Sequence, residues 1–254
     1  MCGGGLLKEL LEQLYLWVDD YIQSFYTDNK YIQPMIALKE EHTKCVVTHC
    51  RELAENLRMS NHDCVLAEII GLLHDIGRFK QYSIYQTFND RLSENHAALG
   101  LAEIADLALL RQLTDDDREV IHFAIINHNA KKIARVTDER KVLFAKLIRD
   151  ADKLDIYRVL SPRLKPSDGT GVNADFIQLF LSGRQCDYTL IKTSDDQKLV
   201  RLLWLYDIYF PWTMRKIIAC GYFEEIVKFL PEDEQIKQGV ALLDSYIQKF
   251  AARN

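Results

Sequence analysis

His74 and Asp75 are adjacent in the sequence and follow a strongly apolar stretch, residues 67–73. Apolar residues on most of a helix circumference predict a helix that is buried on several sides. Gly77 comes two residues after the pair, and a glycine in the left-handed conformation commonly ends a helix, so we expect the pair in the last helical turn. An imidazole and a carboxylate at a dry helix end, which favours a cation, are candidate ligands for a metal ion.

The pair needs partners from elsewhere in the chain. Neighbouring side chains of a helix point about 100° apart, so His74 and Asp75 cannot chelate one ion as two histidines four residues apart do. Other stretches with a helical pattern supply further candidates, in chain order His42, His96, His128 and Asp152. For the remaining histidines we expect a structural role for His49, and a structural or solvent-facing position for His122.

The order of these residues resembles the HD superfamily of metal-dependent phosphohydrolases. The resemblance is carried by His42, by the His-Asp-Ile-Gly sequence at 74–77 and by the Ala-Asp-Lys-Leu sequence at 151–154, and covers roughly residues 35–160. It implies an all-α fold, an HD-domain helical bundle with a C-terminal helical extension packed on it. It also implies a set of metal ligands: His42, His74, Asp75 and Asp152.

Members of the superfamily with further histidines after the His-Asp pair extend this set. Here they add His96 and His128, and Asp75 is then free to bridge two ions, with a bridging hydroxide as the nucleophile. The donors suit a divalent transition metal such as Mn, Fe, Co, Ni or Zn, with one or two ions per chain. Bound metal would leave positions for water and a phosphate oxygen, and would lower the pKa of that water. We therefore expect hydrolysis of a small-molecule phosphate ester or nucleotide.

Cationic side chains near these positions are candidates to hold a phosphate group. Arg149 and Lys153 lie within one turn of Asp152, and with Asp75 they are our candidate catalytic residues. Residues 77–93 lose helical periodicity, which predicts a long functional loop. The candidate substrate-binding residues are Arg78, Lys80 and Arg91 in that loop, and Asn129 directly after His128.

Two other functions would use the same residues. The resemblance also extends to mixed-valent di-iron oxygenases with this His and Asp set, and only the metal and the substrate distinguish them. A non-catalytic ligand-binding domain is disfavoured because every motif position is filled. No residue stands out as a separate general base, with Asp90 and Glu94 as weak candidates. The Gly-Tyr-Pro element of cyclic-dinucleotide phosphodiesterases is absent, so that substrate is not assigned.

The composition is that of an ordinary globular protein. Of 254 residues, 48% are hydrophobic and 27% are charged, which argues against disorder. The net charge of -5 argues against a stable nucleic-acid partner, because such binding needs a basic surface. The six cysteines form no Cys-x-x-Cys pair and follow no export signal, so we expect free thiols in the cytoplasm. The apolar stretch 202–212 is too short to span a bilayer, so no membrane association is expected, and the oligomeric state stays open.

The helical patterns divide the chain into three parts. An amphipathic helix over 6–26 belongs to an N-terminal part, 1–34, packed on the core, and residues 35–160 form the metal-binding domain. Within this domain we expect helices at 35–57, 62–76, from a Ser93 cap onward, 120–127 and 138–160. Two prolines and two glycines in 161–171 mark the boundary to the C-terminal extension, 161–254. Its helical patterns at 173–183, 195–220 and 233–252 are expected to pack on the first half in one globular unit.

Overall fold

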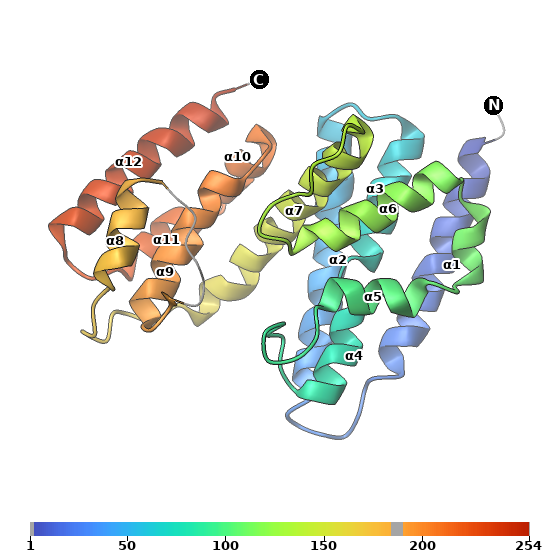
Figure 1. The fold of residues 1–254 in the computed structure, drawn as a ribbon, viewed down its shortest axis with the longest axis horizontal. Helices are drawn as coiled ribbons and strands as arrows, with labels where there is room; N and C mark the ends of the chain where they lie inside the picture. The colour runs from blue at the N-terminus through green and yellow to red at the C-terminus, as the bar shows by residue number, and fades with distance from the viewer. Residues whose placement is uncertain (1–2, 184–189, 254) are drawn as a thin grey trace. The chain divides into compact units, whose positions relative to one another are not determined.

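The computed structural model describes residues 3–183 and 190–253, and this part of the chain is all-α, as expected, with no strand. The chain forms two compact units, Met1–Asp155 and Ile156–Asn254, and the division between them falls inside one long helix, α7 (Figure 1). Among the described residues, no helix combines the length and the apolar character that crossing a lipid bilayer requires. Four cysteines, Cys45, Cys50, Cys64 and Cys220, are free thiols, and Cys2 and Cys186 lie outside the described residues.

The first unit is built around two helices that pack along each other, α2 and α3, with α1 covering α3 (Figure 1). Its helices are α1 (Gly3–Gln23), α2 (Gln33–Asn56), α3 (Asn61–Leu73), α4 (Ile76–Tyr85), α5 (His96–Ile104), the short 3-10 helix η1 (Ala108–Gln112), α6 (Asp115–His128) and α7 (Glu139–Leu160). Ser60 caps α3 by accepting a hydrogen bond from the backbone N–H of Asp63. Every residue from Val65 to Leu73 is buried, which confirms a helix that is buried on several sides.

The link between α3 and α4 corrects the predicted helix end. α3 stops at Leu73, and the chain passes through His74 and Asp75 directly into α4, so Gly77 lies in the first turn of the next helix. Gly77 has no left-handed φ. Its use is close packing, because a Cβ there would lie 2.2 Å from the carbonyl oxygen of His96 and 2.5 Å from the backbone nitrogen of Gly100. Two glycines therefore let α4 and α5 cross backbone to backbone, which places Asp75 near His96.

The prediction of a loop over 77–93 was wrong for its first half. Residues 76–85 form α4, which ends at Gln86 in the left-handed conformation with φ 50°. The periodicity is obscured because α4 buries a polar residue, Gln81, and exposes an apolar one, Ile84. The loop proper is 87–95, and the cap of α5 is Asn95 instead of the expected Ser93, since its side chain accepts from the N–H of Ala98.

The second unit is a set of shorter helices around a core of its own. These are the end of α7, η2 (Ser161–Arg163), α8 (Ala174–Leu181), α9 (Ser194–Leu203), η4 (Trp204–Asp207), α10 (Pro211–Ala219), α11 (Tyr222–Lys228) and α12 (Glu234–Ala251). The pattern expected over 195–220 is interrupted at η4, and Pro211 starts a new helix because proline is well tolerated in a first turn. Gly239 lets α12 approach the ring of Phe180 on α8, where a Cβ would lie 2.4 Å from a ring carbon. The packing of these helices on the first half stays a prediction.

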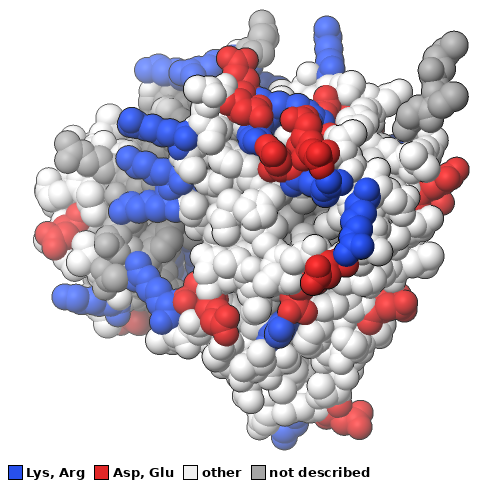
Figure 2. Space-filling model, turned by 45° about the vertical axis from the view of Figure 1, so that its right-hand side comes forward, with Lys and Arg blue, Asp and Glu red and all other residues white. Residues whose placement is uncertain are grey.

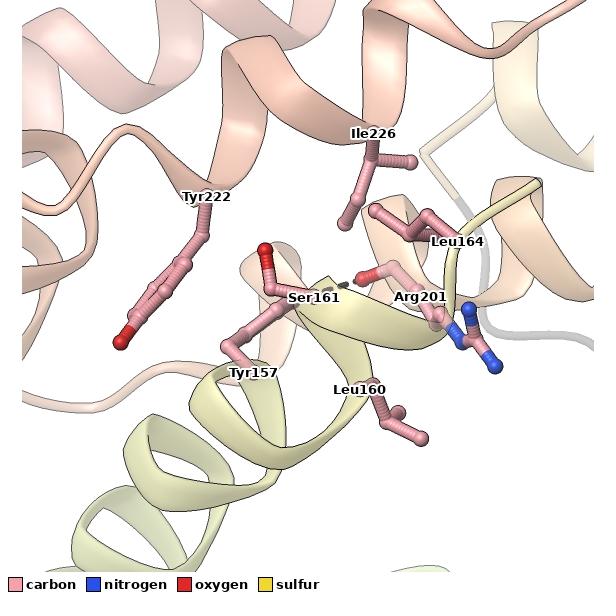
Figure 3. Close-up of a pocket in the computed structure, with 7 residues that line it drawn as sticks. All are labelled: Tyr157, Leu160, Ser161, Leu164, Arg201, Tyr222 and Ile226. Atoms are coloured by element: carbon pink, nitrogen blue, oxygen red, sulfur yellow. Dashed lines mark hydrogen bonds between the residues drawn. The ribbon is translucent and has the colours of Figure 1, made fainter. Parts of the chain in front are cut away.

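A small pocket lies within the second unit, where the end of α7 meets α9 and α11 (Figure 3). The hydroxyl of Tyr157 donates to the carbonyl oxygen of Arg201 at 2.6 Å, and the ring of Tyr157 stacks on Tyr222 with centroids 6.0 Å apart. The remaining lining residues are Leu160, Ser161, Leu164 and Ile226. None of the residues expected to do chemistry lines this pocket.

Candidate metal centre

Two groups of side chains in the first unit could each hold a metal ion. In the first group, one ligand atom from each of His42, His74 and Asp152 lies within 4.8 Å of the others. His42 Nε2 is 3.1 Å from Asp152 Oδ1, and His74 Nε2 is 3.9 Å from the same oxygen. α2, the link after α3, and α7 each supply one member. We call these three residues the first cluster.

The second group consists of Asp75, His96 and His128, again with one ligand atom each within 4.8 Å of the others. His96 Nε2 is 3.2 Å from Asp75 Oδ1, and His128 Nε2 is 3.6 Å from it. His96 opens α5 and His128 ends α6, so the crossing of α4 with α5 is what brings this group together. We call these residues the second cluster.

Asp75 faces both clusters, with one carboxylate oxygen toward each. Its Oδ1 points to His96 and His128, whereas its Oδ2 lies 3.5 Å from His42 Nε2 and 3.7 Å from His74 Nε2. A carboxylate in this position can share one oxygen with each of two ions. The structure therefore brings together all six residues that the sequence suggested as ligands, and it places Asp75 where a bridging ligand would have to be.

The four histidines are all held in the same way. Each Nδ1 atom lies beside an oxygen: His42 beside Asp155 Oδ2 at 2.6 Å, His74 beside the Gly71 carbonyl at 2.7 Å, His96 beside Asp90 Oδ2 at 2.8 Å and His128 beside the Ile125 carbonyl at 2.6 Å. An acceptor at Nδ1 fixes the proton on that atom and leaves the Nε2 lone pair free, as in histidines that bind metals. All four Nε2 atoms are thereby prepared as ligands.

These Nε2 atoms have no adequate partner in the protein itself. His42 Nε2 and His74 Nε2 are buried without a hydrogen-bond partner, although buried polar atoms usually have one. His96 Nε2 and His128 Nε2 lie 2.9 Å apart, and with the protons on both Nδ1 atoms neither Nε2 has a donor to accept from. Cations in the two clusters would satisfy all four atoms at once. The donor set of imidazoles and carboxylates therefore fits divalent transition metals.

The electrostatics of the clusters keep His74, Asp75 and Asp152 in forms that bind metal. Burial lowers the pKa of His74 to about 4, so this imidazole is neutral at physiological pH. Burial and Lys39 lower the pKa of His42, but the nearby carboxylates of Asp152 and Asp155 outweigh both, so the net shift is upward. Burial would raise the pKa values of Asp75 and Asp152, yet Lys39 and the histidines bring that of Asp75, and His42 and His74 that of Asp152, below the usual range. Ionised carboxylates and a neutral imidazole are the required ligand states.

One residue beside the clusters was missed by the sequence reasoning. Lys39 Nζ donates to Asp75 Oδ2 at 2.7 Å and lies 5.4 Å from the centre of the Phe88 ring. A signal for it existed, since Lys39 is three residues before His42 and therefore on the same face of α2. The spacing alone suggests no function for Lys39. Its contact with Asp75 is apparent only from the structure.

Asp90 holds the second cluster from the loop 87–95. Besides His96, its carboxylate accepts hydrogen bonds from Arg78 Nη1 at 3.0 Å, from Gln81 Nε2 at 2.9 Å and from Asn129 Nδ2 at 3.0 Å. Burial raises the pKa of Asp90, but His96 and Arg78 lower it to well below the usual range. Asp90, a weak candidate for a general base, is thus an ionised carboxylate that orients a ligand histidine.

Arg149 and Lys153, expected to contact phosphate, occupy different environments. Arg149 is buried, and its Nη1 donates to the carbonyl oxygens of Asn127, His128 and Ala130. These contacts hold the end of α6, where backbone carbonyls lack helical partners. They support a positioning role for Arg149, and the catalytic role that the sequence suggested stays a prediction. Lys153 is half-buried on α7 directly after Asp152.

The four expected substrate contacts separate into two pairs. Arg78 Nε lies 3.5 Å from Asp75 Oδ1, and Asn129 reaches Asp90, so both are next to the second cluster. Lys80 donates to Glu103 Oε1 at 2.6 Å, and its described contacts link α4 to α5 and not to either cluster. Arg91 is exposed in the loop. His49 and His122 belong to neither cluster, and His122 is exposed on α6.

Comparison with known proteins gives one finding. The sequence model of a family described as HD domain matches residues 40–157, a segment that contains all six candidate ligands. No curated protein and no solved structure matches the chain.

Proposed function

From the premise that residues 40–157 belong to the HD domain family, a superfamily of metal-dependent phosphohydrolases, we propose that this chain hydrolyses a small-molecule phosphate ester or nucleotide. The observation that supports this most strongly is the position of Asp75, with one oxygen toward each of two ligand clusters. The ions would be held by His42, His74 and Asp152 on one side and by His96 and His128 on the other, with Asp75 shared. When bound, they would activate a water and neutralise charge on the phosphoryl oxygens.

The protein's own groups have defined tasks in this proposal. Asp155 and Asp90 hold the Nδ1 protons of His42 and His96, so that the Nε2 atoms stay aimed at the clusters. Burial of the ligands excludes bulk water from the second cluster. Lys39 and Arg78 place two positive charges beside Asp75, which favours an anionic substrate. The proposed partner is thus a small phosphorylated molecule, without a stable nucleic-acid partner, acted on in the cytoplasm.

The experiment is a hydrolysis panel with the purified chain. Phosphomonoesters, phosphodiesters and nucleotides are offered with added Mn²⁺, Fe²⁺, Co²⁺ or Ni²⁺, and phosphate or nucleoside release is measured. We expect release from at least one class, and a loss of at least about 100-fold in His74→Ala, because a ligand of the first cluster is removed. His122→Ala, an exposed histidine on the helix that carries His128, should keep full activity.

A di-iron oxygenase on the same ligands is the alternative outcome of this panel. Tightly bound iron, consumption of oxygen and no hydrolysis of any phosphorylated compound would replace the hydrolase proposal. Equal hydrolysis by wild type and His74→Ala would also contradict it, because the released phosphate would then come from a contaminant or from another site.

A further inference from the structure

The two clusters differ in how they reach solvent. Among the candidate ligands, Asp152 of the first cluster has a side chain 16% exposed, whereas His96 and His128 of the second cluster are each 2% exposed. Lys39, which contacts the Asp75 oxygen on the side of the first cluster, is also 16% exposed. Asp152 and Lys39 therefore connect the first cluster to solvent.

The ammonium group of Lys39 has hydrogen-bonding capacity left. It carries three N–H donors, and within residues 3–183 and 190–253 its hydrogen-bond acceptor is Asp75 Oδ2. Arg78, the other cation beside Asp75, is fixed through its Nη1, which donates to the Phe88 carbonyl, to Gln81 and to Asp90 on the side of the second cluster, and its Nε is buried without a hydrogen-bond partner. On the side of the first cluster, Lys39 is accordingly the cation with donors available for a ligand.

The contact between Lys39 and Asp75 changes when the first cluster holds an ion. Asp75 Oδ2 lies 3.5 Å and 3.7 Å from the Nε2 atoms of His42 and His74, so an ion bound there would share this oxygen. The ion would weaken the attraction of the carboxylate for the ammonium group and would also repel that group directly. An anion bound by that ion would be a new partner for the ammonium group. The Phe88 ring, 5.4 Å away, helps to hold the ammonium group in this position.

We infer that Lys39 is a substrate-binding residue, which donates hydrogen bonds to a phosphoryl oxygen at the first cluster. This inference rests on the proposed function for the identity of the anion, but the binding of phosphate tests it separately from hydrolysis. The bond replaces part of the contact with Asp75, so Lys39 holds Asp75 in the free protein and the phosphoryl group in the complex.

The test measures binding of inorganic phosphate to the chain loaded with Mn²⁺, by calorimetry, for wild type and three variants. Lys39→Met removes the charge, Lys39→Arg retains it, and Lys141→Met is the control. Lys141 is matched because its side chain is 19% exposed and it pairs with a carboxylate, Glu119, within the same unit. We expect Lys39→Met to weaken phosphate binding about 10- to 100-fold, with Lys39→Arg within a few fold of wild type and Lys141→Met unchanged.

Metal content and KM complete the test. In Lys39→Met the number of ions per chain should equal that of wild type, and KM for any substrate found should rise more than kcat falls. Phosphate binding as tight as in wild type would overturn the inference, and so would a loss of metal in Lys39→Met, which would make Lys39 only the charge partner of Asp75. If phosphate binding weakens while wild type hydrolyses nothing, the proposed function fails and the role of Lys39 stands.

Discussion

At the scale of single residues, the clusters depend on groups outside the set of candidate ligands. Each histidine has an oxygen at Nδ1, and for two of them this oxygen belongs to a carboxylate, Asp155 or Asp90. A carboxylate raises the basicity of the imidazole and fixes its orientation. The two clusters thus each have one histidine that is held by an acidic side chain.

Replacement of Asp90 should therefore act on one cluster alone. In Asp90→Ala, His96 loses its acceptor, and we expect the affinity for the second ion to fall about 10- to 100-fold, with the first ion retained. Metal titration of the metal-free protein, followed by counting of the sites, measures this. Glu94→Ala in the same loop is the control, since Glu94 is exposed and contacts Tyr85 instead of a ligand. Loss of both ions in Asp90→Ala would contradict independent support of the clusters.

At the scale of helices, the crossing of α4 and α5 sets the distance between Asp75 and His96. Gly77→Ala would place a methyl group against the backbone of His96 and Gly100, which cannot rotate away as a side chain would. We expect a loss of about 1–3 kcal/mol of stability and weaker binding of the second ion. Unfolding midpoints in denaturant measure the first effect. Gly5→Ala on α1, where a Cβ meets nothing within 4 Å, should be neutral or slightly stabilising. An unchanged midpoint in Gly77→Ala would show that the crossing is not tight.

Ion pairs also hold the three helices α3, α6 and α7 together. Arg140 of α7 donates to Asp63 of α3 at 2.8 Å and to Asp117 of α6 at 2.7 Å, and His62 lies 3.0 Å from Asp117. Burial would raise the pKa of Asp117, but Arg140 and His62 lower it below the usual value. Figure 2 shows acidic and basic side chains side by side on the face that it draws.

The interactions of Asp117 with Arg140 and His62 predict that stability depends on pH. Because the folded pKa of Asp117 is lowered, its contribution is present above the unfolded value of about 3.9 and is lost as the pH falls toward the folded pKa. We expect Asp117→Asn to be about 1–2 kcal/mol less stable than wild type at pH 7, and the difference to shrink below about pH 4. Denaturant unfolding at pH 7, 5 and 3.5 measures it. A difference that stays constant over this range would rule out the ionised carboxylate as its source.

The sequence predicted the helices and the ligands better than their connections. The six ligand candidates stand in recognisable contexts, and α3, α6 and α7 have strong apolar patterns or caps, so these could be predicted. α4 could not, because it buries Gln81 to hold Asp90 and exposes Ile84, which hides its period. Gly77 looked like a helix end because a close backbone crossing and a left-handed turn both select glycine. Lys39 contacts Asp75, which is 36 residues away in the sequence, and Asp90 contacts His96, which is 6 residues away.

At the scale of the whole molecule, the division into units runs close to the metal centre. The first unit ends at Asp155, the residue that holds His42, and the same helix continues into the second unit. The segment that matches the HD domain, 40–157, also ends there. α1 lies before this segment but packs on α3, so the first unit is larger than the family match. The second unit has its own buried polar pair, Asp195 and Lys198, 2.7 Å apart.

The central claim concerns this whole arrangement: two clusters that share Asp75 and hold two ions. The most direct measurement is the number of metal ions per chain, by elemental analysis after loading and dialysis, for wild type and His128→Ala side by side. We predict close to two ions for wild type and close to one for His128→Ala, because the first cluster is complete without His128. One ion in both proteins would contradict the account, and it would make the second cluster a set of substrate contacts around a single metal.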